Sequence, residues 1–317
     1  MWADRKMRRL AMVGENMRTS ELKLLTDAFR KHPFDPNIDI GKLRARLDRF
    51  AAHYAPPANL SIEQITIAGC AAERIVAGDG PHVLFLHGGG YVVGSAKSHR
   101  HMAAALAADI RGTVYVLEYR LAPEAPFPAA AQDCIAAYAE LAHSHLAIVG
   151  DSAGGGLAFL TAIAARDRGL ALPTSIVAIS PWVNLGSEHE CYDLLAEADP
   201  ALSREAAEWY AAHYLGGNLA SDPTASPLFA KLAGLPPTLI QISDCEVFFG
   251  DAARMHTALI GAGVNSELSV WKDMFHVWHL YWPDLSEGRD AILAAAAFIA
   301  EKSENAAEAK INGFAAR

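Results

Sequence analysis

The segment Gly150-Asp151-Ser152-Ala153-Gly154 places a serine in a tight, glycine-flanked turn. It follows the apolar run 146–149 and precedes a helix-like stretch, 157–166, so we expect the serine at a strand-to-helix junction. Glycine on both sides permits the strained backbone that would lift the hydroxyl clear of a sheet. The N-terminus of the helix would direct free N–H groups and the positive end of its dipole at a nearby oxygen. The segment predicts a nucleophilic serine; a glycine-rich turn with a helix-capping serine is the alternative.

A second glycine-rich segment, His87-Gly88-Gly89-Gly90-Tyr91, lies between a short apolar run and a helix-like stretch. Three consecutive glycines let the backbone approach a ligand closely and present successive N–H groups in one direction. An oxyanion hole requires this arrangement. We therefore expect the N–H groups of Gly88, Gly89 and Ala153 to form an oxyanion hole, and a merely flexible loop is the alternative.

A serine hydroxyl becomes a strong nucleophile when a neighbouring imidazole takes its proton. In one large class of serine hydrolases the acid, and then the histidine, follow the nucleophile along the chain. His276 has this order and lies just past the β-like run 266–271, in the loop where the last strand should end. His279 lies three residues further on and is the alternative. We favour His276 as the general base.

Three carboxylates lie after the strand-like run 238–242, and each could orient the imidazole. Asp251 falls where the next helix should begin, and stabilisation of that helix terminus is a sufficient explanation for it. Asp244 could serve only to stabilise a turn. Glu246 lies in the loop after the strand end, where a carboxylate could reach an imidazole nitrogen.

Several motifs occur together in one order along the chain. They are His87-Gly88-Gly89-Gly90, Tyr119-Arg120-Leu121-Ala122-Pro123-Glu124 with Pro126-Phe127-Pro128-Ala129, Gly150-Asp151-Ser152-Ala153-Gly154-Gly155, Ser180-Pro181-Trp182 and Phe275-His276. Across residues 60–300 the chain resembles a bacterial member of the hormone-sensitive lipase family of α/β-hydrolases. The resemblance implies a Ser–acid–His triad with the acid in the loop after the penultimate strand, and no metal or cofactor.

The register of the acid loop decides which carboxylate the resemblance selects. Aligning residues 246–251 with the family loop puts the acid on Glu246. The family loop usually opens with glycine, whereas Ser243-Asp244-Cys245 precedes the acid here. A slip of one or two residues towards Asp244 is therefore the alternative.

Strand-like runs alternate with helix-like stretches from about residue 60, which predicts a mostly parallel, doubly wound sheet covered on both faces. The runs are 62–67, 72–76, 82–86, 113–118, 146–150, 174–180, 238–242 and 266–271. We expect an α/β-hydrolase catalytic domain over residues 55–317. Its rhythm is interrupted near 183–230, and this insertion is expected to lie over the active site.

The first 54 residues are expected to form an N-terminal helical cap segment, with helices near 3–30 and 39–54 whose apolar positions pack onto the body. With the insertion they would cover the substrate pocket. Four aromatic residues are expected to line that pocket: Tyr91, Trp182, Trp209 and Tyr214. The Ala/Lys-rich tail from residue 303 is expected to fray.

Length and composition fit one catalytic domain, since 317 residues with 52% hydrophobic content can bury a sizeable core. No apolar stretch reaches the roughly 18 residues needed to span a bilayer. The N-terminal residues lead into no uninterrupted apolar run, so a secretory signal is not supported and a cytoplasmic location is expected. The 4 cysteines lack the paired spacing of a metal site or a disulfide framework.

The charge of the chain is uneven. Residues 1–50 hold 12 Lys and Arg against 7 Asp and Glu, although the whole chain has a net charge of −9. An acidic body argues against nucleic acid, whose phosphates it would repel. We therefore expect a small-molecule ester as the partner, no nucleic acid and no stable membrane insertion; a homodimer is left open.

Together these residues predict a serine carboxylesterase that hydrolyses short- to medium-chain uncharged esters through an acyl-enzyme. A lactonase or an amidase would use the same triad, because fold and triad do not identify the leaving group. A small-molecule receptor on the same fold is the alternative outside the enzymes, and it would be expected to lack a working triad.

Overall fold

The computed structural model describes residues 20–142 and 146–315. Most of the expected helix over 3–30 therefore lies outside the described residues, and its end is observed as α2. None of the helices in the described part of the chain is long and apolar enough to cross a membrane.

The centre of the molecule is a sheet of eight strands in the order β1-β2-β4-β3-β5-β6-β7-β8. The strands are β1 (Ser61–Ile67), β2 (Cys70–Val76), β3 (His82–Leu86), β4 (Thr113–Leu117), β5 (Leu146–Asp151), β6 (Ile176–Ile179), β7 (Thr238–Ser243) and β8 (Ser266–Trp271). Strand β2 pairs antiparallel with β1 and β4, and the pairs from β4 to β8 are parallel. The predicted α/β fold with a mostly parallel sheet is confirmed.

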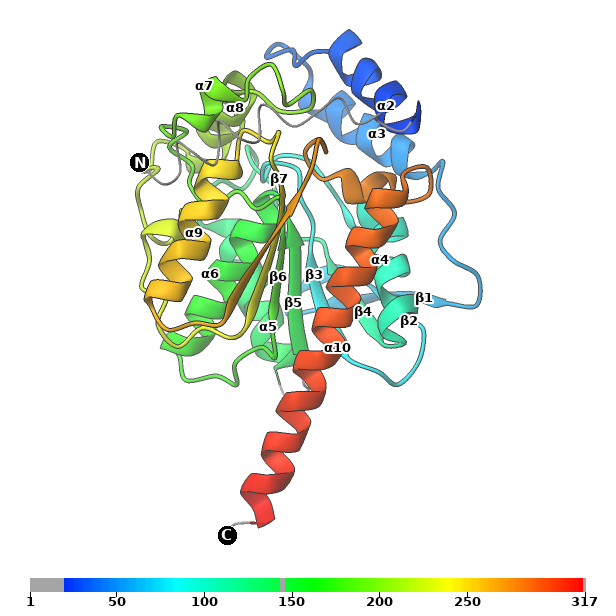
Figure 1. Cartoon of the computed structure of the whole chain (residues 1–317), viewed down its shortest axis with the longest axis vertical. Helices are drawn as coiled ribbons and strands as arrows, with labels where there is room; N and C mark the ends of the chain where they lie inside the picture. The colour runs from blue at the N-terminus through cyan, green and yellow to red at the C-terminus, as the bar shows by residue number, and fades with distance from the viewer. Residues whose placement is uncertain (1–19, 143–145, 316–317) are drawn as a thin grey trace.

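Helices cover both faces of the sheet (Figure 1). On one face lie α5 (Ala129–Leu141), α6 (Ala153–Asp167) and α9 (Phe249–Gly261), and on the other lie α4 (Ala96–Ile110) and α10 (Ser286–Ala315). Because successive side chains of a strand point to opposite faces, each central strand contributes side chains to a hydrophobic core on either side of the sheet. Leu84 and Leu86 of β3 pack with α5 and α6, whereas Val83 and Phe85 pack with α4 and α10. This explains why the central strands are apolar at every position.

The carboxyl ends of the parallel strands are covered by two segments that are far apart in the sequence (Figure 1). The N-terminal segment contributes α2 (Ser20–Lys31) and α3 (Ile40–Ala51). The insertion after β6 contributes α7 (Cys191–Leu194), α8 (Arg204–Leu215) and the short 3-10 helix η1 (Pro227–Phe229); a second 3-10 helix, η2 (Trp278–Tyr281), follows β8.

The two covering segments contact each other directly. Trp209 of α8 donates its indole N–H to the carbonyl of Pro36 at 3.0 Å. The ring of Phe34 packs against the rings of Trp209 and Tyr210, with centroids 5.6 and 6.1 Å apart. These contacts join the N-terminal segment to the insertion above the sheet.

The chain beyond residue 303 differs from the sequence expectation. It continues α10 as a helix to Ala315 and extends away from the body of the molecule (Figure 1). Its alanines have the highest helix propensity of any residue, which favours continuation of a helix that the body has already nucleated. The prediction of a frayed tail is therefore wrong for the described residues.

Candidate active site

Ser152 lies between β5 and α6 with a φ of +50°, a region that non-glycine residues rarely occupy. The neighbouring glycines make this conformation possible. A methyl group on Gly154 would collide with the carbonyl of Leu86, and one on Gly150 would collide with the carbonyl of Gly154. The turn therefore needs glycine at both positions, as the sequence motif indicates.

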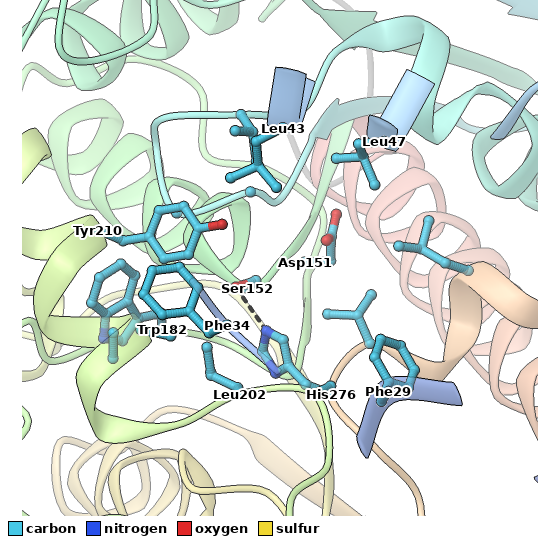
Figure 2. Close-up of a pocket in the computed structure, with 18 of the residues that line it drawn as sticks. Phe29, Phe34, Leu43, Leu47, Asp151, Ser152, Trp182, Leu202, Tyr210 and His276 are labelled. Atoms are coloured by element: carbon cyan, nitrogen blue, oxygen red, sulfur yellow. Dashed lines mark hydrogen bonds between the residues drawn. The ribbon is translucent and has the colours of Figure 1, made fainter. Parts of the chain in front are cut away.

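The structure brings Ser152, His276 and Glu246 into one hydrogen-bonded chain. His276 Nε2 lies 2.9 Å from Ser152 Oγ, and the two side chains point toward each other in Figure 2. His276 Nδ1 lies 2.7 Å from Glu246 Oε2. With Nδ1–H donating to the carboxylate, Nε2 is left as the acceptor for the serine proton.

Glu246 is fully buried, and its other oxygen is also held. Oε1 accepts hydrogen bonds from the Ser243 N–H at 2.8 Å and the Ser180 hydroxyl at 2.9 Å. The same Ser180 oxygen accepts the N–H of Val277, beside the histidine, at 3.2 Å. Ser180, which sequence reasoning treated only as part of a motif, thus ties the acid to the histidine loop.

The protonation of His276 is set by opposing effects. Burial disfavours its charged form, but the hydrogen bond and charge of Glu246, with the charges of Asp199 and Asp151, outweigh burial and raise the pKa of His276 above its ordinary value. His279 behaves in the opposite way, since burial lowers its pKa to about 3. His279 Nε2 lies 3.0 Å from Gln241 Oε1, and His279 is not among the residues that line the cavity.

The two alternative acids do not contact His276. Asp244 Oδ1 accepts the Asp273 N–H at 2.8 Å, which is a turn-stabilising bond. Asp251 lies in the first turn of α9, where its carboxylate contacts Asn184 and Arg254. The geometry therefore joins the histidine to Glu246 among the three carboxylates.

The glycine loop differs from expectation at its first glycine. The Gly88 N–H donates a hydrogen bond to Asp151 Oδ1 at 2.9 Å, so it is already used by the residue before the nucleophile. Gly89 and Gly90 line the cavity instead. In the described part of the chain, the N–H groups of Gly89, Gly90 and Ala153 have no hydrogen-bond partner. The expectation that Gly88 donates to an oxyanion is wrong, because the tertiary bond to Asp151 already uses its N–H.

A cavity of about 360 Å³ lies directly above Ser152, between the sheet and the two covering segments (Figure 2). Its walls are mainly apolar and include Phe29, Phe34, Leu43, Leu47, Trp182, Leu202, Tyr210 and Phe248. Both covering segments therefore contribute walls. Of the four aromatic residues expected in the pocket, Trp182 is among the lining residues.

The other three expected pocket aromatics lie elsewhere. Tyr91 and Tyr214 are fully buried and stack on each other, with ring centroids 3.8 Å apart. Trp209 faces the N-terminal segment through its bond to Pro36. Its neighbour Tyr210 lines the cavity, and a methyl group on Gly90 would collide with the Tyr210 ring. The aromatic content of the insertion was a correct signal of an apolar wall, but it did not distinguish Trp209 from Tyr210.

One group of potential metal ligands lies near the strand ends. Side-chain oxygens of Asp244 and Asp273 and the sulfur of Cys245 lie within 4.8 Å of one another. They are half-buried, and Asp244 is already bonded to the Asp273 backbone. We assign no metal to these residues.

Comparison with known proteins shows which family the chain belongs to. A family model described as the alpha/beta hydrolase fold matches residues 83–280. An acetyl-hydrolase of Streptomyces hygroscopicus is 38% identical over 89% of this chain and 97% of its own length. An esterase of Acinetobacter venetianus is 28% identical over 86% of this chain and 93% of its own length.

Solved structures give the same result. The crystal structure of EstE5 soaked with p-nitrophenyl butyrate has a TM-score of 0.86 and 38% identity, covering 90% of this chain and all of that one. An esterase from the bacterial hormone-sensitive lipase family has a TM-score of 0.87 and 36% identity, covering 91% of this chain and 100% of its own. This chain belongs to the bacterial hormone-sensitive lipase family of α/β-hydrolase esterases.

Proposed function

We propose that this protein is a serine carboxylesterase that hydrolyses uncharged esters of short to medium acyl chain, with Ser152 as nucleophile, His276 as general base and Glu246 as the orienting acid. The observation that carries the proposal is the hydrogen-bonded chain of these three residues at the floor of an apolar cavity. Nucleophile, base and orienting acid are the groups that acyl transfer requires.

In the first half of the reaction, Ser152 Oγ attacks the ester carbonyl while His276 Nε2 takes its proton. Glu246 holds the imidazole in the tautomer that can accept the proton, and it stabilises the imidazolium that forms. His276 then gives the proton to the leaving alcohol, and an acyl-enzyme remains. In the second half, water attacks the acyl group with His276 again as base, and the acid product leaves Ser152 free.

The oxyanion of each tetrahedral intermediate is proposed to bind the N–H groups of Gly89, Gly90 and Ala153. The support is that these three groups have no other partner in the described chain, and that Ala153 is the first residue of α6. A helix N-terminus also favours negative charge. Removal of one such donor commonly costs about 10²- to 10³-fold in kcat.

The substrate class is supported by the size and lining of the cavity. Its volume of about 360 Å³ is at the small end of ligand pockets, which span roughly 300–1,000 Å³. A panel of nitrophenyl esters of increasing acyl length should show falling kcat/KM beyond medium chains. Long-chain triglyceride emulsions should be poor substrates, and activity that rises sharply at a lipid interface would contradict the assignment.

The nucleophile is tested by Ser152→Ala. We expect a loss of about 10⁶-fold in kcat, since the members of a triad act as a unit, and loss of labelling by a fluorophosphonate. Ser175→Ala is a matched control, because Ser175 is also buried and its hydroxyl has no hydrogen-bond partner among the described residues. Labelling of the wild type at another residue, or turnover retained by Ser152→Ala, would refute the proposal.

We also propose a cytoplasmic location, no binding of nucleic acid and a homodimer. The net charge of −9 supports the absence of nucleic-acid binding. The dimer is supported by β8, an edge strand of the sheet on which Val270 is 49% exposed, because an unpaired edge can accept a second strand. Sedimentation of the purified protein, alone and with duplex DNA, tests the homodimer and the absence of nucleic-acid binding.

A further inference from the structure

We propose that Asp199, in the insertion that covers the active site, is a positioning residue of the triad that links the cavity wall to the acid loop and supports the charged form of His276. Asp199 lies between α7 and α8, 47 residues before Glu246 in the sequence. The proposal rests on the proposed function, since it concerns the same triad.

The carboxylate of Asp199 connects two parts of the site. Its Oδ2 accepts the N–H of Val247, the residue after the triad acid, at 3.1 Å. Its Oδ1 accepts the N–H groups of Ala201 and Leu202 at 3.0 and 3.1 Å. Ala201 and Leu202 line the cavity, as His276 does, and Leu202 and His276 are both drawn at its wall in Figure 2. One side chain thus fixes a turn of the cavity wall and anchors it to the acid loop.

Asp199 is only 5% exposed, so its charge is poorly screened by water. Burial, with the nearby charge of Glu246, raises the pKa of Asp199 to about 6, while the charge of His276 and the backbone donors oppose the rise. Above that pH the carboxylate is ionised and favours the imidazolium of His276. Two other carboxylates, those of Glu246 and Asp151, also favour the charged form of His276. The charge of His276 in turn lowers the pKa of His279.

This arrangement has a chemical consequence. Above the pKa of His276 the imidazolium forms only when the serine proton is transferred, so in that pH range a second negative charge near the ring stabilises the transition state more than the ground state. Asp199 does not contact Ser152 or the reacting atoms. It acts through the position of the acid loop and through its charge.

The test compares Asp199→Asn with Asp199→Ala and with a matched control. The asparagine oxygen can keep the two bonds within the turn, so this variant removes the charge and the bond to Val247 while the wall keeps its shape. Asp199→Ala also removes the turn. Asp222→Asn is the control, because Asp222 lies in the same insertion and makes the same kind of bond, to the Thr224 N–H at 2.8 Å, without contact to the triad.

Two readouts separate a positioning role from a merely structural one. The pKa of His276 is measured by NMR titration of the whole protein, and kcat and KM are measured from pH 5 to 9 on one short nitrophenyl ester. In Asp199→Asn we expect the pKa of His276 to fall by roughly half a unit to one unit, with the acid limb of kcat/KM moving to lower pH. We expect kcat at pH 8 to fall up to about tenfold, the factor that corresponds to one pKa unit, with little change in KM. Asp199→Ala should in addition alter KM for longer esters.

An unchanged His276 pKa and an unchanged kcat in Asp199→Asn would overturn the proposal, as would an equal shift in Asp222→Asn. The NMR titration needs no turnover. If the wild type hydrolysed no ester, the proposed function would fail while the titration still decided whether Asp199 acts on His276.

Discussion

Replacing Glu246 by glutamine should strongly lower kcat, because the proton of the neutral His276 ring would lie on the wrong nitrogen while the shape of the site changes little. Both groups that contact Glu246 Oε1, the Ser243 N–H and the Ser180 hydroxyl, donate hydrogen bonds in the structure. The Ser243 N–H can only donate, so the single oxygen of the glutamine side chain is required at that position. Its NH₂ group then faces His276 Nδ1.

That NH₂ group can only donate, so Nδ1 becomes the acceptor and the neutral ring carries its proton on Nε2. Nε2, which lies 2.9 Å from Ser152 Oγ, then no longer accepts the serine proton. In the serine protease triad the equivalent Asp-to-Asn change lowers kcat by about 10⁴-fold. We expect a loss of the same order here, which corresponds to about 5.4 kcal/mol in activation free energy at 1.36 kcal/mol per factor of ten.

The assay is kcat on one soluble nitrophenyl ester for Glu246→Gln, Asp244→Asn and Asp251→Asn, with folding checked by circular dichroism. Asp244→Asn should be mild, because an amide oxygen can still accept the Asp273 N–H. Asp251→Asn weakens a pair between the buried Asp251 carboxylate and the half-exposed Arg254, so it should lower stability and leave kcat nearly unchanged. If Asp244→Asn were the crippled variant and Glu246→Gln turned over normally, the reasoning would be refuted and the acid would be Asp244.

Three further predictions concern the same site. Gly89→Ala should lower kcat by at least about 10²-fold, because a methyl group there would collide with the Val93 carbonyl and Gly89 has a φ of +117°. The measurements are kcat and circular dichroism, with the remote Gly169→Ala as the control variant. Normal turnover would contradict the assignment of Gly89 to the oxyanion hole. Ser180→Ala should lower kcat by roughly tenfold or more, since it removes one of the charge-assisted hydrogen bonds of Glu246; an unchanged kcat in a folded variant would contradict this. The kcat/KM of the wild type should fall as the pH drops through the raised pKa of His276, because the base must be neutral. The midpoint of the acid limb should therefore lie above the ordinary histidine value of 6.5. A midpoint below 6.5 would contradict the placement of the negative charges around the ring.

The strands and the order of the proposed triad residues could be read from the sequence because each depends on a local pattern. Apolar runs bounded by polar turns mark the strands, and the nucleophile needs glycines at fixed offsets. The direction of individual groups could not be predicted. Which N–H of the glycine loop is engaged depends on Asp151, 63 residues from Gly88, and no local pattern reports that bond.

The direction of the aromatic side chains near the pocket could not be predicted from the sequence either. Composition predicted an aromatic wall, but one residue of offset on α8 decides whether a ring faces the cavity, as Tyr210 does, or the N-terminal segment, as Trp209 does. Tyr91 follows the glycine loop in the sequence, yet its ring turns inward to stack on Tyr214. Such choices are made by tertiary packing, which the sequence pattern does not contain.

The cavity has a floor and walls of different origin. The floor, with Ser152 and His276, comes from loops at the strand ends, whereas most of the apolar wall comes from the N-terminal helices and the insertion after β6. Those two outer segments meet through Phe34, Pro36 and Trp209 and contribute no atom to the hydrogen-bonded chain from serine to acid. Apart from Asp199, whose carboxylate anchors the acid loop, the residues that break the ester bond and those that shape the apolar wall thus lie on separate stretches of polypeptide. Substitutions in the outer segments can reshape the cavity for a different acyl group while the reacting atoms keep their positions. This architecture can therefore accept new substrates without a change of mechanism.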